Sequence, residues 1–223
     1  MSPKSMTTRT LPCSRMVIAL TGFMGCGKSS VGRELSVLLR MPLIDLDKYI
    51  VDKAGKSIAD IFAEQGEKAF RDLESKALAE LLMGPGSSSS ETSCSAGPPQ
   101  SKLGSPPLML PRVAQFPRGN FPDKNMASHN DLILSLGGGT ILRPENAAMI
   151  KEHCTCIFLR ATVETLRLHL GGDQSHRPLL KDGGFEAMLA ERTPLYTAAA
   201  DFIIDIDSIS PMQTAGIIAN LIT

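Results

Sequence analysis

Neither sign of charge dominates this sequence, which contains 23 lysines and arginines and 23 aspartates and glutamates. Without a net charge, the chain lacks the long-range field that draws proteins onto nucleic acid or anionic membranes. Long apolar runs are also missing, since no stretch approaches the roughly 18 residues of a membrane span. We therefore expect no nucleic-acid partner and no membrane partner, and any anion-binding site must be local.

Cysteine is scarce and its count is odd, five in 223 residues, which does not fit a disulfide framework in a chain of this length. A reducing compartment is the better interpretation. Cys154 and Cys156 lie in an apolar segment, and no second pair of cysteines or histidines has the spacing of a zinc site. Two buried strand thiols are therefore preferred over a metal site.

Two segments have compositions that cannot build a core. Residues 1–15 contain basic and hydroxyl residues, but neither an acid nor the apolar stretch of a signal peptide. In residues 84–107, glycine, proline and serine supply 17 of 24 residues, and further prolines follow. We predict a disordered N-terminal tail over 1–15 and one domain over 16–223, interrupted by a disordered insertion at 84–128. We expect a cytoplasmic monomer, with a plastid import signal in the tail as the alternative.

The rest of the chain alternates short apolar segments with amphipathic ones. The apolar segments predict strands at 16–20, 43–44, 132–136, 155–159 and 202–206. The other segments predict helices near 31–39, 57–65, 67–81, 145–152, 162–170, 184–200 and 211–222. Because continuous apolar strands alternating with helices form parallel sheets covered on both faces, we predict a three-layer α/β/α fold with a five-stranded parallel sheet. Ligands in such folds gather at the carboxyl ends of the strands.

A phosphate-binding loop follows the first predicted strand. Residues 22–29 match the pattern G-x-x-x-x-G-K-[ST] in its required context, after a strand and at the start of a helix. In this motif the backbone N–H groups turn inward on the phosphates, the helix N-terminus adds partial positive charge, and Lys28 adds a full one. Ser29 is expected to bind magnesium. The predicted nucleotide site consists of Gly22, Gly25, Cys26, Gly27, Lys28, Ser29 and Ser30.

Two acids stand where the second strand ends. The two-residue period of a strand points Asp45 and Asp47 to the same face. Asp45 is placed to hold magnesium through water, because magnesium keeps several waters and uses few carboxylates. Asp47 is placed to bind a substrate hydroxyl. The alternative is that Asp47 is the N-cap of a helix starting at Lys48.

Two arginines on predicted helices are candidate anion ligands. Arg192 has apolar residues three and four positions away, so it projects along the apolar stripe of its helix, where a guanidinium needs an anionic partner. Arg71 has Glu67 four residues before it and Glu74 three after it. Surface ion pairs are therefore the alternative role for Arg71.

Glycines mark two further candidate segments. Gly137, Gly138 and Gly139 follow a strand, where the absence of side chains permits backbone contact with a ligand; a flexible turn is the alternative. Arg177 lies in a polar loop with a glycine pair at each end, a pattern typical of a hinged lid. An arginine on a closed lid stabilises charge on a transferring phosphoryl group.

Taken together, these residues resemble the shikimate kinase family, and several motifs in matching order carry the resemblance. It extends from about residue 16 to the C-terminus, except for the insertion. The motifs are the P-loop at 22–29, Asp45-Leu-Asp47, Ser57-Ile-Ala-Asp-Ile-Phe62, Gly66-Glu67 with Phe70-Arg71 and Glu74, Ser135-Leu-Gly-Gly-Gly139, Arg177-Pro-Leu-Leu180, and Arg192-Thr-Pro-Leu-Tyr196.

The resemblance implies ATP-dependent phosphorylation of shikimate at its 3-hydroxyl, giving shikimate 3-phosphate and ADP, in the biosynthesis of aromatic amino acids. It implies ATP and Mg²⁺ as cofactors. Carried over by position, it implies that shikimate is held by Asp47, Arg71, Gly137, Gly138, Gly139 and Arg192. The residues that it implies for phosphates and magnesium are Lys28, Ser29, Asp45 and Arg177, and the catalytic ones are Asp47, Lys28 and Arg177. Two arginines would then grip the carboxylate, and Asp47 would bind ring hydroxyls.

Two other functions compete with this one. Another small P-loop kinase, for gluconate or a nucleoside monophosphate, would share the nucleotide site, but a nucleotide acceptor would need more arginines. A regulatory protein that kept the fold and lost catalysis is the third possibility, and the intact Lys28, Asp45 and Asp47 argue against it. One departure from the family is that residues 207–210, in the loop before the last helix, contain no basic residue.

Overall fold

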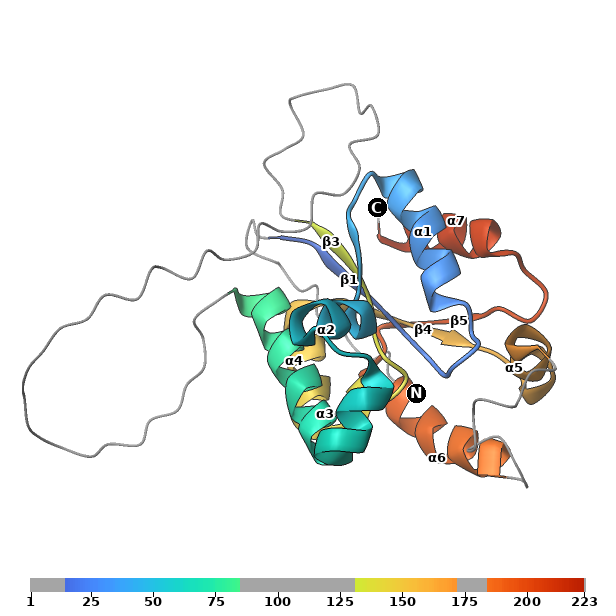
Figure 1. Cartoon of the computed structure of the whole chain (residues 1–223). Coiled ribbons are helices and arrows are strands. Elements are labelled where there is room, and N and C mark those ends of the chain that lie inside the picture. The colour runs from blue at the N-terminus through green and yellow to red at the C-terminus, as the bar shows by residue number, and fades with distance from the viewer. Residues whose placement is uncertain (1–14, 85–130, 172–183, 223) are drawn as a thin grey trace, which may run out of the picture. The chain divides into compact units, whose positions relative to one another are not determined.

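A single parallel sheet organises the computed structural model, which describes residues 15–84, 131–171 and 184–222 (Figure 1). The strand order is β2-β3-β1-β4-β5, and every neighbouring pair is parallel. The strands are β1 (Val17–Thr21), β2 (Leu43–Asp45), β3 (Leu132–Ser135), β4 (Thr155–Arg160) and β5 (Phe202–Asp205). The five predicted strands and their parallel arrangement are confirmed. The predicted tail and insertion lie outside the described residues, apart from Arg15 and Gly84.

Helices cover both faces of this sheet, as the sequence pattern predicts. The α-helices are α1 (Lys28–Leu39), α2 (Leu46–Ala54), α3 (Ile58–Met83), α4 (Pro144–His153), α5 (Val163–Leu170), α6 (Gly184–Ala199) and α7 (Pro211–Ile222). A short 3₁₀ helix, η1 (Thr140–Leu142), precedes α4. Figure 1 shows α1 and α7 together on one side of the sheet and α3, α4 and α6 on the other.

The central strands are apolar along their whole length because helices exclude water from both of their faces. In β1, Ile18, Ala19 and Leu20 are completely buried, and in β3 the same is true of Ile133 and Leu134. Polar side chains therefore concentrate just beyond the strand ends. The carboxyl ends of β1, β2 and β3 lie side by side, with Leu20 and Asp45 both in register with Ser135. No described helix combines the length and apolar composition needed to span a membrane.

The junction between β2 and α2 differs from the prediction. The strand ends at Asp45, and α2 begins at the next residue, so Asp45 and Asp47 do not alternate along one strand. Asp45 is the N-cap of α2, since its side chain accepts a hydrogen bond from the backbone N–H of Lys48. The alternative that Asp47 is the N-cap is therefore wrong, and Asp47 lies in the first turn of the helix.

A glycine divides α3 into two helical segments. Ser57 caps the first segment, as predicted, by accepting a hydrogen bond from the N–H of Asp60. Gly66 then interrupts the helix with φ 79° and ψ 173°, a conformation that is essentially restricted to glycine. The predicted stop at Gly66 is confirmed, and the helix resumes at Glu67. This break sets the direction of the second segment, which carries Arg71 and Glu74.

Alanine substitutions at Gly66 and Gly216 should have opposite effects on stability. A Cβ atom would meet no atom within 4 Å at either position, so backbone conformation alone decides the outcome. Gly66→Ala should destabilise by about 1–3 kcal/mol because of its positive φ. Gly216→Ala, inside α7, should stabilise by about 0.5–1 kcal/mol. Urea unfolding of both variants measures the difference, and equal effects would contradict the role of the Gly66 backbone.

Candidate active site

The phosphate-binding loop connects β1 to α1 and is folded around the Lys28 ammonium group. Lys28 Nζ donates hydrogen bonds to the carbonyl oxygens of Gly22, at 2.8 Å, and Phe23, at 3.0 Å. A Cβ atom on Gly22 would lie 2.6 Å from the carbonyl oxygen of Leu159, so this position requires glycine. Gly27, immediately before α1, has a left-handed backbone with φ 80°. The loop thus places a lysine and a helix N-terminus together, the arrangement that binds phosphate.

The start of α1 also contacts the end of β2. Ser29 Oγ donates a hydrogen bond to Asp45 Oδ2 at 3.1 Å, while the other carboxylate oxygen of Asp45 caps α2. A hydroxyl and a carboxylate are the oxygen donors that Mg²⁺ takes, together with water and substrate phosphates. Among the described residues, no group of three or more His, Cys, Asp or Glu could hold a metal ion. The Ser29–Asp45 pair therefore fits magnesium bound jointly with a nucleotide.

Asp47 lies among charges from several elements. The pKa of Asp47 is raised from 3.8 to about 6, chiefly by burial and then by the nearby carboxylates of Asp45 and Glu74. The positive charges of Lys28 and Arg71 act in the opposite direction. One carboxylate thus interacts with the phosphate-binding loop, the end of β2 and α3. A carboxyl group whose pKa is shifted this far is typical of functional sites.

Glu74 is a buried carboxylate at the centre of a polar network. Its side chain is 1% exposed and accepts a hydrogen bond from Arg71 Nη1 at 2.8 Å and from Thr140 Oγ1 at 2.6 Å. Arg71 itself is only 18% exposed, so the surface ion-pair alternative does not describe its contact with Glu74. Only the partner Glu67, 3.5 Å away, is largely exposed. Glu74 thus fixes the Arg71 guanidinium beside the site.

The importance of Glu74 was not recognised from the sequence. Glu74 lies four residues after Phe70 and three before Ala77, and both of these apolar side chains are buried. An acid on the apolar stripe of a helix needs a partner in the interior. That position is the signal that could have identified it.

The glycine segment after β3 fits closely against these charged groups. A Cβ atom on Gly137 would lie 2.7 Å from Asp47 Oδ1, and one on Gly139 would lie 2.3 Å from Arg71 Nη1. Gly138 is less crowded, with the nearest atom, the backbone nitrogen of Met24, 3.8 Å from such a Cβ. The segment then enters η1 through a hydrogen bond from the N–H of Thr140 to the carbonyl of Gly137. Missing side chains therefore permit close packing here, which a flexible turn would not need.

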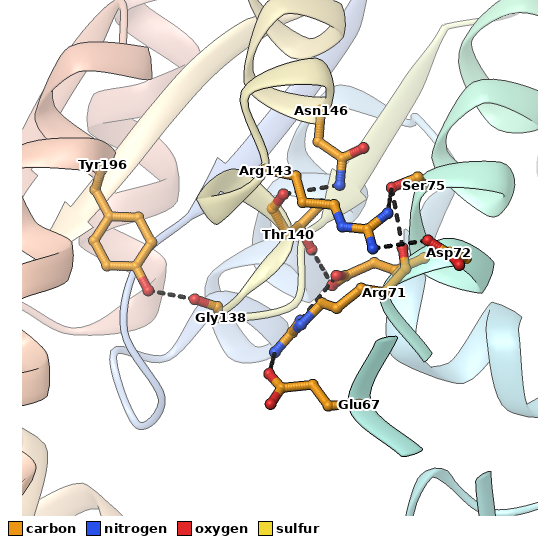
Figure 2. A network of polar contacts seen from close by, with 10 residues as sticks. Glu67, Arg71, Asp72, Ser75, Gly138, Thr140, Arg143, Asn146 and Tyr196 are labelled. Atoms are coloured by element: carbon orange, nitrogen blue, oxygen red, sulfur yellow. Dashed lines mark hydrogen bonds and ion pairs between the residues drawn. The ribbon is translucent and has the colours of Figure 1, made fainter. Parts of the chain in front are cut away.

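Helix α6 brings Arg192 to the phosphate-binding loop from the opposite end of the sequence. The guanidinium carbon of Arg192 lies 5.9 Å from the ring centroid of Phe23. Burial raises the pKa of Tyr196 to about 12, while the charges of Arg192 and Arg71 lower it. Because both guanidinium groups act on one phenol, the two arginines converge on the same region. That phenol donates a hydrogen bond to the carbonyl of Gly138 (Figure 2).

The remaining predicted residues have simpler environments. Cys26 is buried, with Sγ 3.7 Å from Lys28 Nζ, and Ser30 donates its N–H to the carbonyl of Gly27 in the first turn of α1. Cys154 and Cys156 are buried free thiols, as expected, and burial raises the pKa of Cys154 to about 12. Arg177 lies outside the described residues, so its role on a lid remains a prediction.

Comparison with known proteins gives one consistent family. The family model described as shikimate kinase matches residues 24–88 and 124–223. A shikimate kinase from Dictyoglomus turgidum is 32% identical over 198 residues, covering 87% of this chain and 90% of the relative. One from Salinibacter ruber is 35% identical over 196 residues, covering 82% and 74%.

Solved structures agree with these relatives. The structure of shikimate kinase from Acinetobacter baumannii in complex with shikimate has a TM-score of 0.67 at 27% identity, covering 93% of each chain. The crystal structure of shikimate kinase from Aquifex aeolicus has a TM-score of 0.63 at 25% identity, covering 92% of this chain and 95% of that one.

The shifted pKa of Asp47 predicts a pH-dependent gain in stability for Asp47→Asn. The folded chain holds a proton on Asp47 more tightly than the unfolded chain does, so stability falls as the pH rises from 3.8 to about 6. Asp47→Asn removes this loss and should stabilise the nucleotide-free protein by up to about 3 kcal/mol at pH 8, with little effect at pH 4. Urea unfolding at both pH values measures it.

Asp52→Asn is the matched control for this experiment, because Asp52 is exposed on the same helix. This control should leave the pH dependence of stability unchanged. If the stability of Asp47→Asn depended on pH in the same way as that of the parent chain, the Asp47 carboxyl would not be the group whose ionisation lowers stability.

Proposed function

The chain belongs to the shikimate kinase family, and from this premise we propose that the site at the ends of β1, β2 and β3 transfers the γ-phosphoryl group of ATP to the 3-hydroxyl of shikimate. As a member of the family, the chain is a kinase that uses ATP and acts on shikimate in the shikimate pathway. The proposal assigns that chemistry to individual residues of this chain.

The observation that supports the proposal is that Asp47 and Arg71 pack against one glycine segment, while Arg192 acts on the Tyr196 phenol that is hydrogen-bonded to the same segment. Two guanidinium groups provide paired donors for a carboxylate, and charge-assisted hydrogen bonds of this kind are the strong ones. Asp47 provides an acceptor for hydroxyl groups, and the glycines let Asp47 and Arg71 pack directly against the backbone. A small hydroxylated ring acid needs this combination of groups.

The phosphoryl donor would be held by the phosphate-binding loop, whose Lys28 charge acts on Asp47. Lys28 and the backbone N–H groups of the loop that begins at Gly22 neutralise the phosphates. Phosphoryl transfer has a loose transition state, so alignment and charge neutralisation contribute more than base strength. Asp47 therefore acts first by orienting the acceptor hydroxyl towards the phosphate. Arg177 is proposed to add positive charge to the transferring group.

Ser29 and Asp45 are proposed to hold magnesium. When bound, the ion neutralises charge on the β- and γ-phosphates. Their hydrogen bond of 3.1 Å keeps the two oxygen donors together at the mouth of the loop. The N-cap bond from Lys48 to the other oxygen fixes the carboxylate plane of Asp45.

An acceptor assay tests the substrate. Coupled release of ADP should be observed with shikimate and not with gluconate or AMP. Turnover with either of the other acceptors in place of shikimate would contradict the assignment. Nucleotide binding without turnover on any acceptor would instead favour a regulatory protein.

Replacing Arg71 by lysine tests, in the same assay, whether Arg71 and Arg192 together bind the carboxylate of shikimate, an arrangement called here the carboxylate clamp. Lysine keeps a positive charge next to Glu74 but loses the planar pair of donors. Arg71→Lys should therefore raise the KM for shikimate about tenfold, with the KM for ATP unchanged. Arg33→Lys, at an exposed position on α1, is the matched control. An unchanged KM for shikimate in Arg71→Lys would disprove the clamp.

Replacing Asp45 by asparagine separates metal binding from helix capping. Asparagine caps a helix about as well as aspartate, so Asp45→Asn should change the melting temperature little. The magnesium concentration for half-maximal turnover should rise roughly tenfold or more, because the carboxylate charge is lost. Asp45→Ala should show the same loss and also a lower stability, by about 1 kcal/mol. An unchanged magnesium requirement in Asp45→Asn would remove Asp45 from the metal site.

A further inference from the structure

We propose that Tyr196 is a positioning residue for substrate binding, whose hydroxyl group ties α6 to the glycine segment and so sets the spacing between Arg192 and Arg71. This inference rests on the proposed function, since it assumes that the two arginines grip one carboxylate. It gives a role to a buried residue outside the set proposed to hold the substrate.

The contacts of Tyr196 connect the helix that carries Arg192 to the glycine segment that borders Arg71. Its hydroxyl donates a hydrogen bond to the carbonyl of Gly138, and the next residue, Gly139, packs directly against the Arg71 guanidinium (Figure 2). On the other side, Arg192 precedes Tyr196 by four residues and therefore lies one turn away on the same face of α6. A single hydrogen bond thus joins the element that carries one arginine to the segment that borders the other.

The Tyr196 side chain is held in a fixed position, so its hydroxyl can position the glycine segment. Tyr196 is completely buried, and its ring packs against the Phe158 ring of β4 with centroids 5.2 Å apart. The hydrogen bond to the carbonyl of Gly138 is partly buried, and an acceptor withdrawn from water is costly to leave without a donor, so the bond is maintained. The sheet therefore fixes the ring, and the ring fixes the glycine segment.

The backbone of α6 explains why the hydrogen bond from Tyr196 to Gly138 is needed. Pro194 lies between Arg192 and Tyr196 and cannot donate the helical hydrogen bond to the carbonyl of Ala190. The nearby hydroxyl of Thr193 donates instead to the carbonyl of Leu189, at 2.6 Å, and so does not replace the bond that is missing at Ala190. The turn that carries Arg192 is thus weakened in its own backbone, and the bond from Tyr196 to Gly138 anchors it from outside the helix.

Tyr196→Phe is the test, because phenylalanine keeps the ring on Phe158 and removes only the hydroxyl. The KM for shikimate should rise about three- to tenfold, while the KM for ATP stays unchanged. A residue that only stabilises the fold would lower the melting temperature without separating the two KM values. Tyr49→Phe is the matched control, since Tyr49 on α2 is the second of the two tyrosines in the chain and should leave both KM values unchanged.

A spectroscopic experiment with Tyr49→Phe keeps the proposal testable if Tyr196→Phe fails to fold. The chain has no tryptophan, so Tyr196 is the only tyrosine left in this variant. Shikimate added without nucleotide should perturb its near-ultraviolet spectrum, because a carboxylate arriving at Arg192 changes the electric field at the phenol. A saturable change supports the proposal, and an unchanged spectrum at a shikimate concentration that supports turnover overturns it.

The outcomes distinguish this inference from the proposed function. If the parent chain turns over shikimate and Tyr196→Phe has the same KM values, the positioning role is wrong and the proposed function stands. If the parent chain binds ATP but does not turn over shikimate, the proposed function fails and this inference fails with it.

Discussion

The ion pair between Glu74 and Arg71 is the constraint on which the rest of the site depends. A carboxylate that is 1% exposed is costly unless it is paired and fully hydrogen-bonded, and Arg71 and Thr140 meet that need. The pair in turn holds a guanidinium against the glycine segment, where any side chain at Gly139 would collide with it. The break at Gly66 belongs to the same constraint, because it directs this part of α3 towards the site.

Asp47 illustrates the cost of assembling such a site. Burial and two neighbouring carboxylates disfavour its charged form, and Lys28 and Arg71 offset only part of that effect. The fold therefore keeps an acid where it weakens stability at neutral pH. Functional sites often retain groups of this kind, since the charge is needed for substrate and not for folding. Lys28 is in a related position, because its ammonium group is held by loop carbonyls next to the helix N-terminus.

The strands and helices could be predicted from the sequence, but most of the side-chain contacts between them could not. Strands such as 132–136 could be predicted because a buried parallel strand is a continuous apolar run, and the P-loop because its spacing is fixed by phosphate geometry. The alternative prediction of an N-cap named Asp47 rather than Asp45, because both acids are good caps and only the true end of β2 distinguishes them. By contrast, Thr140 lies 66 residues from Glu74 and Gly138 lies 58 residues from Tyr196, so no local pattern could reveal these two contacts.

The loop before α7 shows how a departure from the family can have a structural cause. Asp207 accepts hydrogen bonds from the N–H and the hydroxyl of Thr162, at 2.8 and 2.9 Å. Thr162 is the N-cap of α5, which follows β4 and packs against the phosphate-binding loop at Gly25. An acid is favoured beside a helix N-terminus, where a basic residue would be repelled. The carboxylate of Asp207 is therefore explained by the start of α5.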